Sequence, residues 1–418
     1  MRSTFNIFGQ VFQAIWANKL RSFLTMFGIA WGVASLLLLI GLGEGFRSGQ
    51  RRELSELGKD IIMAWSGTVP ALPNQHTGMR PYKLTYRDEQ ALRAQAPHIR
   101  AATAMLTRAD IRQVSAYANA GGSVLGVEPN YPDVRTLLID KGRFLDSADM
   151  EQRRKVVVLG PKSESLLFMG YPSIGSFITL DGSRFQVIGV AKKSGRGNND
   201  GQNQQLYIPL STMFELFPLK GENIPEDALT SIQYQPITPD VNETAKAEFH
   251  RVIAARHGFD PGLTDAFEEW DTIKSQKTVG LIFDAMDVFL GGVGIVTLML
   301  GAVGIINIML VTVSERTREI GLRKALGATN RSILMQFFLE GLLLTGLSGT
   351  IGIIGSAIFM VGLAALMGPG MQGFDPPRLV PWSAAMAMGS LTLCGIVAGI
   401  YPARKAAMLE PVEALRKE

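Results

Sequence analysis

The chain has 418 residues, of which 47% are hydrophobic and 19% are charged, and its mean hydropathy is +0.17. The apolar fraction excludes a disordered chain, the charged fraction excludes one that lies mostly within a membrane, and the single Cys394 excludes a site built on several cysteines. A net charge of +4, spread over 41 basic and 37 acidic residues, gives no reason to expect a nucleic-acid partner, so the composition predicts membrane segments combined with a polar domain.

The first predicted element is an amphipathic helix over residues 1–22 on the cytoplasmic face of a membrane, with an ordinary packed helix as the alternative. Its large apolar side chains recur every three or four residues, at Phe5, Phe8, Phe12, Ile15 and Trp16. The uncharged run at 23–43 is long enough to cross a hydrocarbon core about 30 Å thick. Because this run is longer than the apolar part of a signal peptide and ends without a cleavage site, an uncleaved anchor is expected.

Residues 44–283 are expected to form an α/β domain outside the membrane, with a β-rich lobe at about 105–210 inserted into an α/β lobe built from the flanks. Thr85 and Asp88 have the spacing of a capping pair, which predicts a helix over 85–96. Asp181 and Gly182 separate two apolar runs and predict a β-hairpin. Strands are also predicted at 60–64, 155–159, 206–209 and 231–234, a second helix at about 243–257, and a mobile loop at 195–205.

Three further uncharged runs, at 288–313, 342–367 and 380–400, complete a layout of one span, a large domain and three spans. Lys and Arg are enriched in short cytoplasmic flanks. Twelve basic residues lie before the first span, in the loop 314–331 and in the tail 401–418, against Arg378 alone in the short loop between the last two spans. The fold class expected is therefore an α-helical membrane protein with four transmembrane helices and a large extracytoplasmic α/β domain, both termini being cytoplasmic.

No catalytic or metal site is expected in the chain. Gly58 and Lys59 lack the remaining residues of a phosphate-binding loop, and no serine lies in a G-x-S-x-G motif. The four histidines are too scattered for zinc ligands: His76, His98, His250 and His257. The neighbouring Glu268 and Glu269 would point apart on a helix, so a solvated face is expected there and no acid–base pair.

The loop SERTREIGLRKALGATNR at 314–331 is predicted to contain a short helix, with a solvated loop as the alternative. Its acids stand one turn before bases, Glu315 before Arg318 and Glu319 before Arg323. Gly327 is expected to end the helix. Apolar contacts are expected from Ile320, Leu322, Ala325 and Leu326. A charged helix at the membrane edge is suited to dock into a groove of a soluble partner.

The segment ERTREIGLRKALGA between two spans resembles the signature of the MacB and FtsX-like permeases of ABC transporters. The resemblance extends over nearly the whole chain, through LRSFLTMFGIAWGVASLLLLIGLGEG, GRFLD, VVVLG, IGSFITLDGSRFQVIGVAKK, LYIPLSTM and YPARKAAMLEPVEALRKE. It implies a MacB-like core domain at 44–283 and an FtsX-like domain at 284–418. It also implies a permease of the bacterial inner (plasma) membrane, in contact with lipid, that works as a homodimer or pairs with a homologous permease.

The resemblance further implies that the loop helix contacts an ATPase. The coupling residues are then Glu315, Arg316, Arg318, Glu319, Gly321, Arg323, Lys324 and Gly327. Because the chain lacks the fused N-terminal ATPase of MacB, that ATPase is expected to be a separate polypeptide, with ATP and Mg bound to it and no cofactor on this chain. A periplasmic adaptor protein is a further expected partner.

Glycines three or four residues apart on the predicted spans predict close helix packing in lipid, either within the chain or at a dimer seam. The candidates are Gly28, Gly32, Gly349, Gly352, Gly395 and Gly399. Glu340, at the start of the third span, is expected to have a structural role in preference to a transport relay.

The function expected is mechanical transport, in which ATP hydrolysis by the partner moves the external domain and drives export of a periplasmic or outer-leaflet substrate. Two alternatives share the topology. One is an FtsX-like regulator of cell-wall hydrolases, whose external domain would be smaller and lack the inserted lobe. The other is a lipoprotein-releasing permease similar to LolC or LolE. An enzyme is not expected.

Overall fold

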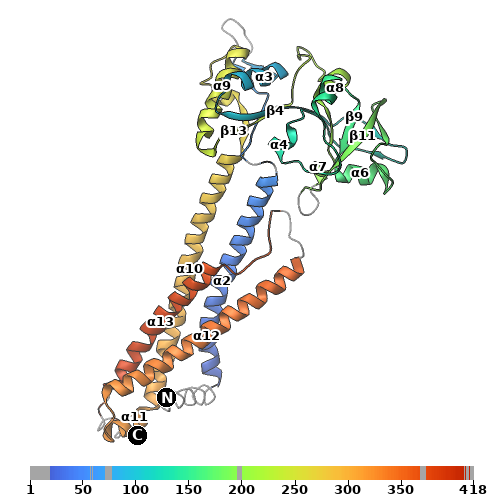
Figure 1. Cartoon of the computed structure of the whole chain (residues 1–418). Coiled ribbons are helices and arrows are strands. Elements are labelled where there is room, and N and C mark those ends of the chain that lie inside the picture. The colour runs from blue at the N-terminus through green and yellow to red at the C-terminus, as the bar shows by residue number, and fades with distance from the viewer. Residues whose placement is uncertain are drawn as a thin grey trace. The chain divides into compact units, whose positions relative to one another are not determined.

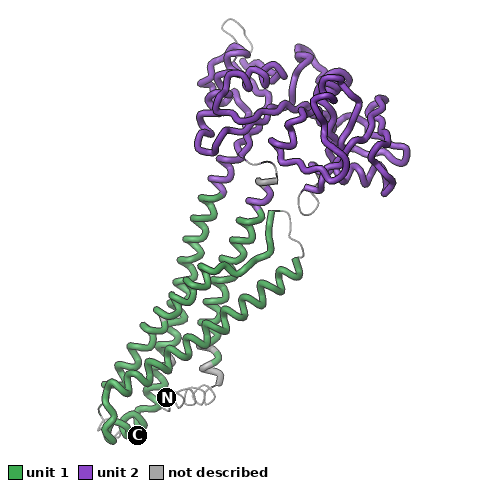
Figure 2. The backbone as a smooth tube through the Cα atoms, viewed as in Figure 1, with its two compact units in different colours: residues 1–49, 280–418 green, residues 50–279 purple. Residues whose placement is uncertain are grey.

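The computed structural model describes residues 19–56, 58, 60–70, 78–194, 200–367, 373–408, 410 and 414. Most of the predicted amphipathic helix, residues 1–18, lies outside the described residues. The chain divides into two compact units, one formed by 1–49 with 280–418 and the other by 50–279, as Figure 2 shows. Two long helices, α2 (Lys19–Glu56) and α10 (Thr272–Glu315), carry residues of both units.

The first unit is built from helices. Besides parts of α2 and α10 it contains α11 (Thr317–Ala325), α12 (Asn330–Met367) and α13 (Pro381–Ala407), labelled in Figure 1. Within the described residues, four helices are long and apolar enough to cross a membrane: α2, α10, α12 and α13. They contain the predicted spans at 23–43, 288–313 and 342–367, and the fourth from Pro381 onward, so the prediction of four membrane helices is confirmed.

Small residues let these helices approach one another closely. A Cβ on Gly352 of α12 would lie 2.5 Å from the backbone oxygen of Ala30 in α2 and 3.0 Å from the Cβ of Val33. Four of the other predicted packing glycines also face neighbouring helices: Gly32 faces Thr297, Gly349 faces Leu391, Gly395 faces Thr345 and Gly399 faces Phe338. Gly28 has open space around it in the described part of the chain. Five of the six glycines therefore pack within one chain.

Replacing Gly352 with valine should lower the thermal stability of the helical unit. The added side chain meets backbone of α2, which cannot move aside like a flexible side chain, so an overpacking cost of about 1–3 kcal/mol is expected. The matched control is Gly355→Val on the same helix, where nothing lies within 4 Å of an added Cβ. Equal unfolding midpoints for the two variants in detergent would contradict the packing of α12 on α2.

One end of α2 is fixed by polar contacts to two other segments of the helical unit. Arg47 pairs with Asp284 of α10 (Nη2–Oδ1 2.6 Å) and with Asp287 (Nη2–Oδ2 3.3 Å). Ser48 donates to Asp375 in the segment between α12 and α13 (Oγ–Oδ2 2.8 Å), and the backbone N–H of Asp375 donates to the carbonyl of Gly45 (2.9 Å). These contacts balance the charge of Arg47 where the apolar part of α2 ends.

The second unit contains a mixed sheet of twelve strands in the order β14-β1-β13-β4-β7-β12-β9-β11-β10-β5-β6, with β8 paired to β11. Its strands are β1 (Ile62–Trp65), β4 (Ile99–Arg108), β5 (Gln113–Val114), β6 (Asn119–Ala120), β7 (Val124–Val127), β8 (Ile139–Gly142), β9 (Val156–Leu159), β10 (Phe177–Leu180), β11 (Ser183–Ala191), β12 (Leu206–Pro209), β13 (Ser231–Pro236) and β14 (Glu268–Asp271). A separate hairpin is formed by β2 (Thr68–Pro70) and β3 (Met79–Pro81). The helices of this unit are α3 (Tyr86–Gln95), α4 (Tyr131–Arg135), α5 (Ser147–Glu151), α6 (Pro161–Phe168), α7 (Asp200–Asn203), α8 (Leu210–Leu216) and α9 (Asn242–His257), with two short 3₁₀ turns at Pro239–Val241 and Thr264–Ala266.

The sheet divides into an inner lobe and an inserted outer lobe. The inner lobe has β14, β1, β13 and β4 in antiparallel pairing, with α3 and α9 packed together beside it (Figure 1). The chain leaves the inner lobe after β4, forms β5 to β12 and returns at β13. The predicted β-rich insertion is therefore confirmed. Helices α6 and α8 lie with the strands of the outer lobe (Figure 1).

Local signals placed several elements correctly. Thr85 caps α3, accepting a hydrogen bond from the backbone of Asp88 (Oγ1–N 3.3 Å), while the carboxylate of Asp88 accepts one from the backbone of Thr85 (Oδ2–N 2.8 Å). Asp181 (φ 42°) and Gly182 (φ 86°) form the tight turn of the predicted hairpin. Of the mobile loop predicted at 195–205, residues 195–199 lie outside the described residues. The prediction is wrong for the remainder, where α7 forms and Asn203 bonds the backbone of Ser194 through both side-chain polar atoms (3.0 and 2.9 Å).

The solvated helix face predicted for Glu268 and Glu269 is also wrong. Both residues lie on β14, where successive side chains face opposite sides of the sheet. Glu268 is exposed, whereas the side chain of Glu269 is only 8% exposed and lies 3.1 Å from Nε2 of His250. The hydroxyl of Tyr234 donates to Glu269 as well (3.1 Å). Glu269 is therefore a buried structural carboxylate of the inner lobe.

Candidate functional site

The predicted coupling segment forms the helix α11 between α10 and α12. Arg316 interrupts the helical path (φ −97°, ψ 10°), and the hydroxyl of Thr317 donates back to the carbonyl of Val313 in α10 (3.1 Å). The helix ends at Leu326, followed by Gly327 with φ 99°, a backbone conformation that side chains with a Cβ rarely adopt. The predicted short helix and its end at Gly327 are thus confirmed.

One face of α11 packs on the rest of the helical unit. Ile320 is 1% exposed and belongs to the main apolar core of this unit. Gly321 approaches Ala414 so closely that an added Cβ would lie 2.6 Å from the methyl group of Ala414. The ammonium group of Lys324 donates to the carbonyl of Ala407 at the end of α13 (2.9 Å). The helix is therefore held against the C-terminal end of the chain, which limits its freedom to move independently.

One hydrogen bond and one ion pair connect α11 and the residue before it to α12. Arg323 pairs with Glu319 on the same helix (Nη2–Oε1 2.6 Å) and donates to Gln336 of α12 (Nη1–Oε1 3.0 Å). Arg316 lies 3.6 Å from Glu340, whose side chain is 7% exposed (Nη1–Oε1). An unpaired charge inside a helical bundle is costly, so the Glu340 carboxylate needs a partner such as Arg316. This contact supports a structural role for Glu340, which connects α12 to the residue before α11.

The predicted ion pair between Glu315 and Arg318 is wrong. Arg318 has no ion-pair partner among the described residues, because the interruption at Arg316 separates the two residues into different helices. The exposed guanidinium of Arg318 is instead one turn before Leu322 and two turns before Leu326. The side chains of these leucines are 54% and 82% exposed. Sequence reasoning grouped them with Ile320, but the structure separates a buried apolar face from an exposed one.

The exposed face of α11, defined by Arg318, Glu319, Leu322 and Leu326, has the composition of a protein interface. Large apolar side chains interleaved with charges are unusual on a free surface and common where a partner covers them. The side chain of Glu319 is 52% exposed although it pairs with Arg323. Within the part of the chain that is described, no group of three or more His, Cys, Asp or Glu side chains is arranged to hold a metal ion.

A second cluster of interest, missed from the sequence, joins the inner and outer lobes of the α/β unit. Arg93 of α3 pairs with Glu89 one turn earlier and with Glu128 just after β7 (Nη2–Oε2 2.8 Å). Glu128 also accepts from the backbone of Ala104 in β4 (2.8 Å). The pKa of Glu89 is raised to about 8: burial raises it most, the neighbouring Glu128 carboxylate adds to this, and Arg93 opposes both effects. The i, i+4 spacing of Glu89 and Arg93 was the only sequence signal for this cluster.

Beside it, Asp88 holds α9 to α3. Burial tends to raise the pKa of the Asp88 carboxyl group, but hydrogen bonds from His257 and Arg256 outweigh this and leave the pKa below its usual value. The distance from Nε2 of His257 to Oδ2 of Asp88 is 2.9 Å. Asp88 therefore favours its ionised form, next to Glu89, whose pKa is raised.

Comparison with known proteins matches both units of the chain. The model of the MacB-like periplasmic core domain matches residues 22–252, and that of the FtsX-like permease C-terminal matches residues 291–411. A macrolide export ATP-binding/permease protein MacB from Bdellovibrio bacteriovorus is 31% identical over 98% of this chain, which covers 61% of that relative. The uncharacterized ABC transporter permease YknZ from Bacillus subtilis is 29% identical over 97% of both chains.

Two solved structures each align with about half of this chain. The periplasmic region of MacB from Actinobacillus actinomycetemcomitans aligns with 54% of this chain and 95% of its own, at 19% identity and a TM-score of 0.42. The extracellular domain of YknZ from Gram-positive bacteria aligns with 50% of this chain and 100% of its own, at 17% identity and a TM-score of 0.41.

Proposed function

Because this chain belongs to the MacB-like and FtsX-like permeases of ABC transporters, we propose that it couples ATP hydrolysis by a separate ATPase to movement of its α/β unit. The exposed face of α11 carries this proposal, since it presents two leucines and an unpaired arginine on a helix that is otherwise held firmly. ATP and Mg would be bound by the partner, and the permease itself would catalyse no reaction.

The proposed orientation places both termini and α11 in the cytoplasm and the α/β unit outside the inner membrane of a bacterial cell. The distribution of basic residues supports it, because Arg316, Arg323, Lys324 and Arg404 gather around α11 and the end of α13. The acidic residues Asp284, Asp287 and Asp375 lie at the opposite end of the helical unit, around Arg47.

The proposed mechanism transmits motion along rigid helices. In a homodimer, or in a pair with a homologous permease, ATP binding by the partner would draw two α11 helices together. Helix α10 has 44 residues, about 66 Å of continuous helix, and runs without a break from the α/β unit to the residue before Arg316. A displacement of α11 therefore has a stiff path to the α/β unit, as a two-state transition of this kind requires.

Export of a periplasmic or outer-leaflet substrate, with an adaptor protein as a further partner, is the function we favour. The MacB relatives are named for macrolide export, and the inserted outer lobe is present in this chain. That lobe separates the chain from the smaller external domain of an FtsX-like hydrolase regulator. A lipoprotein-releasing permease shares the same topology, and identification of lipid-anchored proteins that co-purify with the chain would distinguish it.

Exchange of the Glu319 and Arg323 charges tests docking through α11. The variant Glu319→Arg/Arg323→Glu keeps an i, i+4 pair on the helix but inverts the charges that a partner would meet. If the pair serves only helix stability, the exchange costs no more than about 0.5 kcal/mol and coupling survives. We expect loss of both ATPase co-purification and ATP-driven transport, with only a small fall in the unfolding midpoint from the lost hydrogen bond between Arg323 and Gln336.

The matched control exchanges a second exposed pair outside α11. Arg153 and Glu215 lie 3.3 Å apart with side chains 63% and 48% exposed, so Arg153→Glu/Glu215→Arg is a comparable change in the α/β unit. The control should retain ATPase association. Docking through α11 is refuted if the two exchanged variants behave alike.

A further inference from the structure

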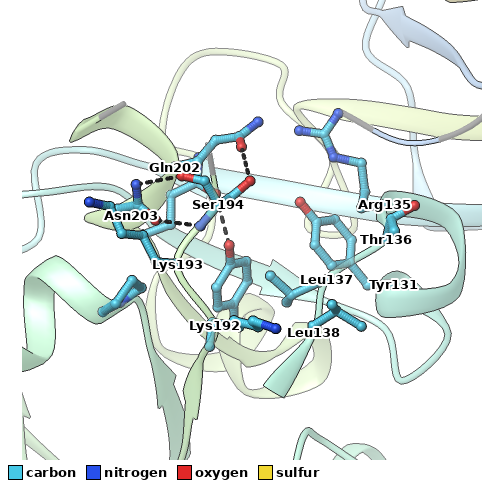
Figure 3. Close-up of a pocket in the computed structure, with 14 residues that line it drawn as sticks. Tyr131, Arg135, Thr136, Leu137, Leu138, Lys192, Lys193, Ser194, Gln202 and Asn203 are labelled. Carbon is cyan, nitrogen blue, oxygen red and sulfur yellow. Dashed lines mark hydrogen bonds between the residues drawn. The ribbon is translucent and has the colours of Figure 1, made fainter. Parts of the chain in front are cut away.

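A cavity of about 310 Å³ opens on the outer lobe of the α/β unit, and its lining includes none of the residues discussed above for coupling. One wall comes from α4 and the segment after it, with Tyr131, Arg135 and Leu138. The other comes from the end of β11 and from α7, with Ser194, Gln202 and Asn203, as Figure 3 shows. Its size is at the lower end of the range for small-molecule sites.

The cavity is positively charged. Its lining contains Arg135, Lys192 and Lys193 and no aspartate or glutamate. Lys192 and Lys193 are exposed, and neither has an ion-pair partner among the described residues. The guanidinium group of Arg135 contacts the sulfur of Met63 (Nη1–Sδ 3.3 Å), so its remaining N–H groups stay available. Three uncompensated cations around one cavity favour an anionic ligand.

The hydroxyl group of Tyr131 adds a hydrogen-bond donor to this charge. Tyr131 is 2% exposed, and no hydrogen-bond partner for its hydroxyl lies in the described part of the chain. Figure 3 shows this hydroxyl directed from the Arg135 side toward the opposite wall. Tyr207 donates to Gln205 (3.0 Å), and burial raises the pKa of the Tyr207 hydroxyl, which therefore stays protonated. The hydroxyl of Tyr131 is therefore available to donate a hydrogen bond to a ligand in the cavity.

The rest of the lining is apolar. Leu137, Leu138 and Pro161 line it, and Leu138, directly before β8, is 59% exposed. A small anion would leave these apolar side chains uncovered, whereas a ligand that also has an acyl chain would cover them. The lining is therefore complementary to a molecule that has both an anionic head and an apolar body.

Backbone strain marks the same wall. Thr136 lies in the left-handed region (φ 50°, ψ 44°), which a β-branched residue seldom adopts. It directly follows Arg135 and precedes Leu137, so the strained residue sets the directions of a cationic and an apolar side chain of the lining. Backbone strain of this kind is often found at ligand sites.

We propose that this cavity binds an anionic amphiphile, with a carboxylate or phosphate head at Arg135, Lys192 and the Tyr131 hydroxyl and an acyl chain along Leu137 and Leu138. The two sources of such a head are a free fatty acid and an anionic membrane lipid. Binding at this site can be measured on the permease alone, so its test does not depend on the ATPase or on the proposed coupling.

The test uses the full chain in nanodiscs of phosphatidylcholine and a diazirine-bearing analogue of decanoate. We expect photolabelling, mapped by mass spectrometry, on peptides that contain residues 131–138 and 191–194. Unlabelled decanoate and decyl phosphate should displace the probe, whereas decyltrimethylammonium and inorganic phosphate should not. Displacement by phosphatidylglycerol in the nanodisc would assign the site to a membrane lipid, and lack of it to a free amphiphile. Labelling confined to the membrane helices would overturn the proposal.

Variants separate the site from non-specific partitioning. Lys192→Glu/Lys193→Glu should lower displaceable labelling by about tenfold or more, because two cations near the head group become anions. Lys155→Glu, at an exposed lysine of the same lobe outside the cavity, should leave labelling unchanged. Leu138→Ser should weaken decanoate more than a short-chain acid. Equal labelling of the double variant and wild type, or equal loss in Lys155→Glu, would refute the site.

Discussion

Aspartate at both Leu322 and Leu326 should abolish ATPase coupling while leaving the permease folded. Both side chains are exposed, so their replacement removes little from the core of the helical unit. If a partner covers them, each leucine contributes about 1.5–3 kcal/mol to binding, and the new carboxylates add a desolvation cost. The affinity for the ATPase should therefore fall by at least about a hundredfold. Co-purification from detergent and ATPase stimulation in proteoliposomes measure this directly.

The control for this variant is Leu166→Asp on α6, a residue 41% exposed in the α/β unit. It makes the same chemical change at a comparable exposure, outside α11. Ordinary ATPase association and transport are expected for it. Should Leu322→Asp/Leu326→Asp associate with the ATPase as wild type does, the exposed face of α11 is not the docking surface, and the coupling proposal loses its main support.

The elements predicted correctly are those whose cause lies within a few residues. An uncharged run of twenty residues specifies a membrane helix without reference to the remainder of the chain. The capping box at Thr85 and the turn at Asp181 and Gly182 are likewise local, because each satisfies its own backbone groups or sets its own φ. The four membrane helices, α3 and the β10–β11 hairpin followed from such signals.

Long-range pairing explains what the sequence could not predict. The burial of Glu269 depends on β14 lying beside β1, where Glu269 is opposite Ala64, two hundred residues earlier. The inserted lobe could be anticipated, but the network of Glu89, Arg93 and Glu128 requires α3 to meet the residue after β7. The periodicity of apolar residues along one segment cannot predict these long-range contacts, because they depend on the order of the strands in the sheet.

In the coupling segment, too, the local features were predictable from the sequence and the long-range contacts were not. Helix formation by α11 and its end at Gly327 were local and predictable. The sequence could not predict that Leu322 and Leu326 would be exposed. Their exposure depends on how the opposite face of α11 packs, with Ile320 in the apolar core and Gly321 against Ala414. The pairing of Arg316 with Glu340 requires the turn between α11 and α12 to bring the two residues together.

Raising the pH should destabilise the α/β unit through Glu89. In the unfolded chain a glutamate ionises near pH 4.5, whereas in the folded unit burial raises the pKa of Glu89 to about 8. Between these values the folded state holds a proton that the unfolded state has released, so the free energy of unfolding falls as the pH rises. The stabilising proton is fully present below pH 4.5 and lost by about pH 8. One proton over this interval corresponds to at most about 5 kcal/mol.

The opposite titration of Asp88 does not mask this effect. Its pKa is lowered in the folded unit by His257 and Arg256, which outweigh burial, so its contribution to stability is present above the ordinary aspartate value of 3.8 and is lost only as the pH falls below that. The two carboxyl groups act in different pH windows. Of these two carboxyl groups, only Glu89 therefore makes the free energy of unfolding vary with pH above pH 4.5.

Glu89→Gln should remove most of that slope. Glutamine has the shape of the protonated acid, still accepts a hydrogen bond from Arg93 and cannot ionise, so the variant should match wild type near pH 5 and exceed it by several kcal/mol near pH 8. Denaturant unfolding of the full chain measures this, with Trp16, Trp31 and Trp382 replaced by phenylalanine so that only Trp65 and Trp270 of the inner lobe report. Glu226→Gln, at an exposed carboxyl group of the same unit, should keep the wild-type slope. Parallel pH profiles for wild type and Glu89→Gln would mean that Arg93 holds Glu89 ionised, and that the junction between the lobes is a permanent salt bridge with no proton to lose.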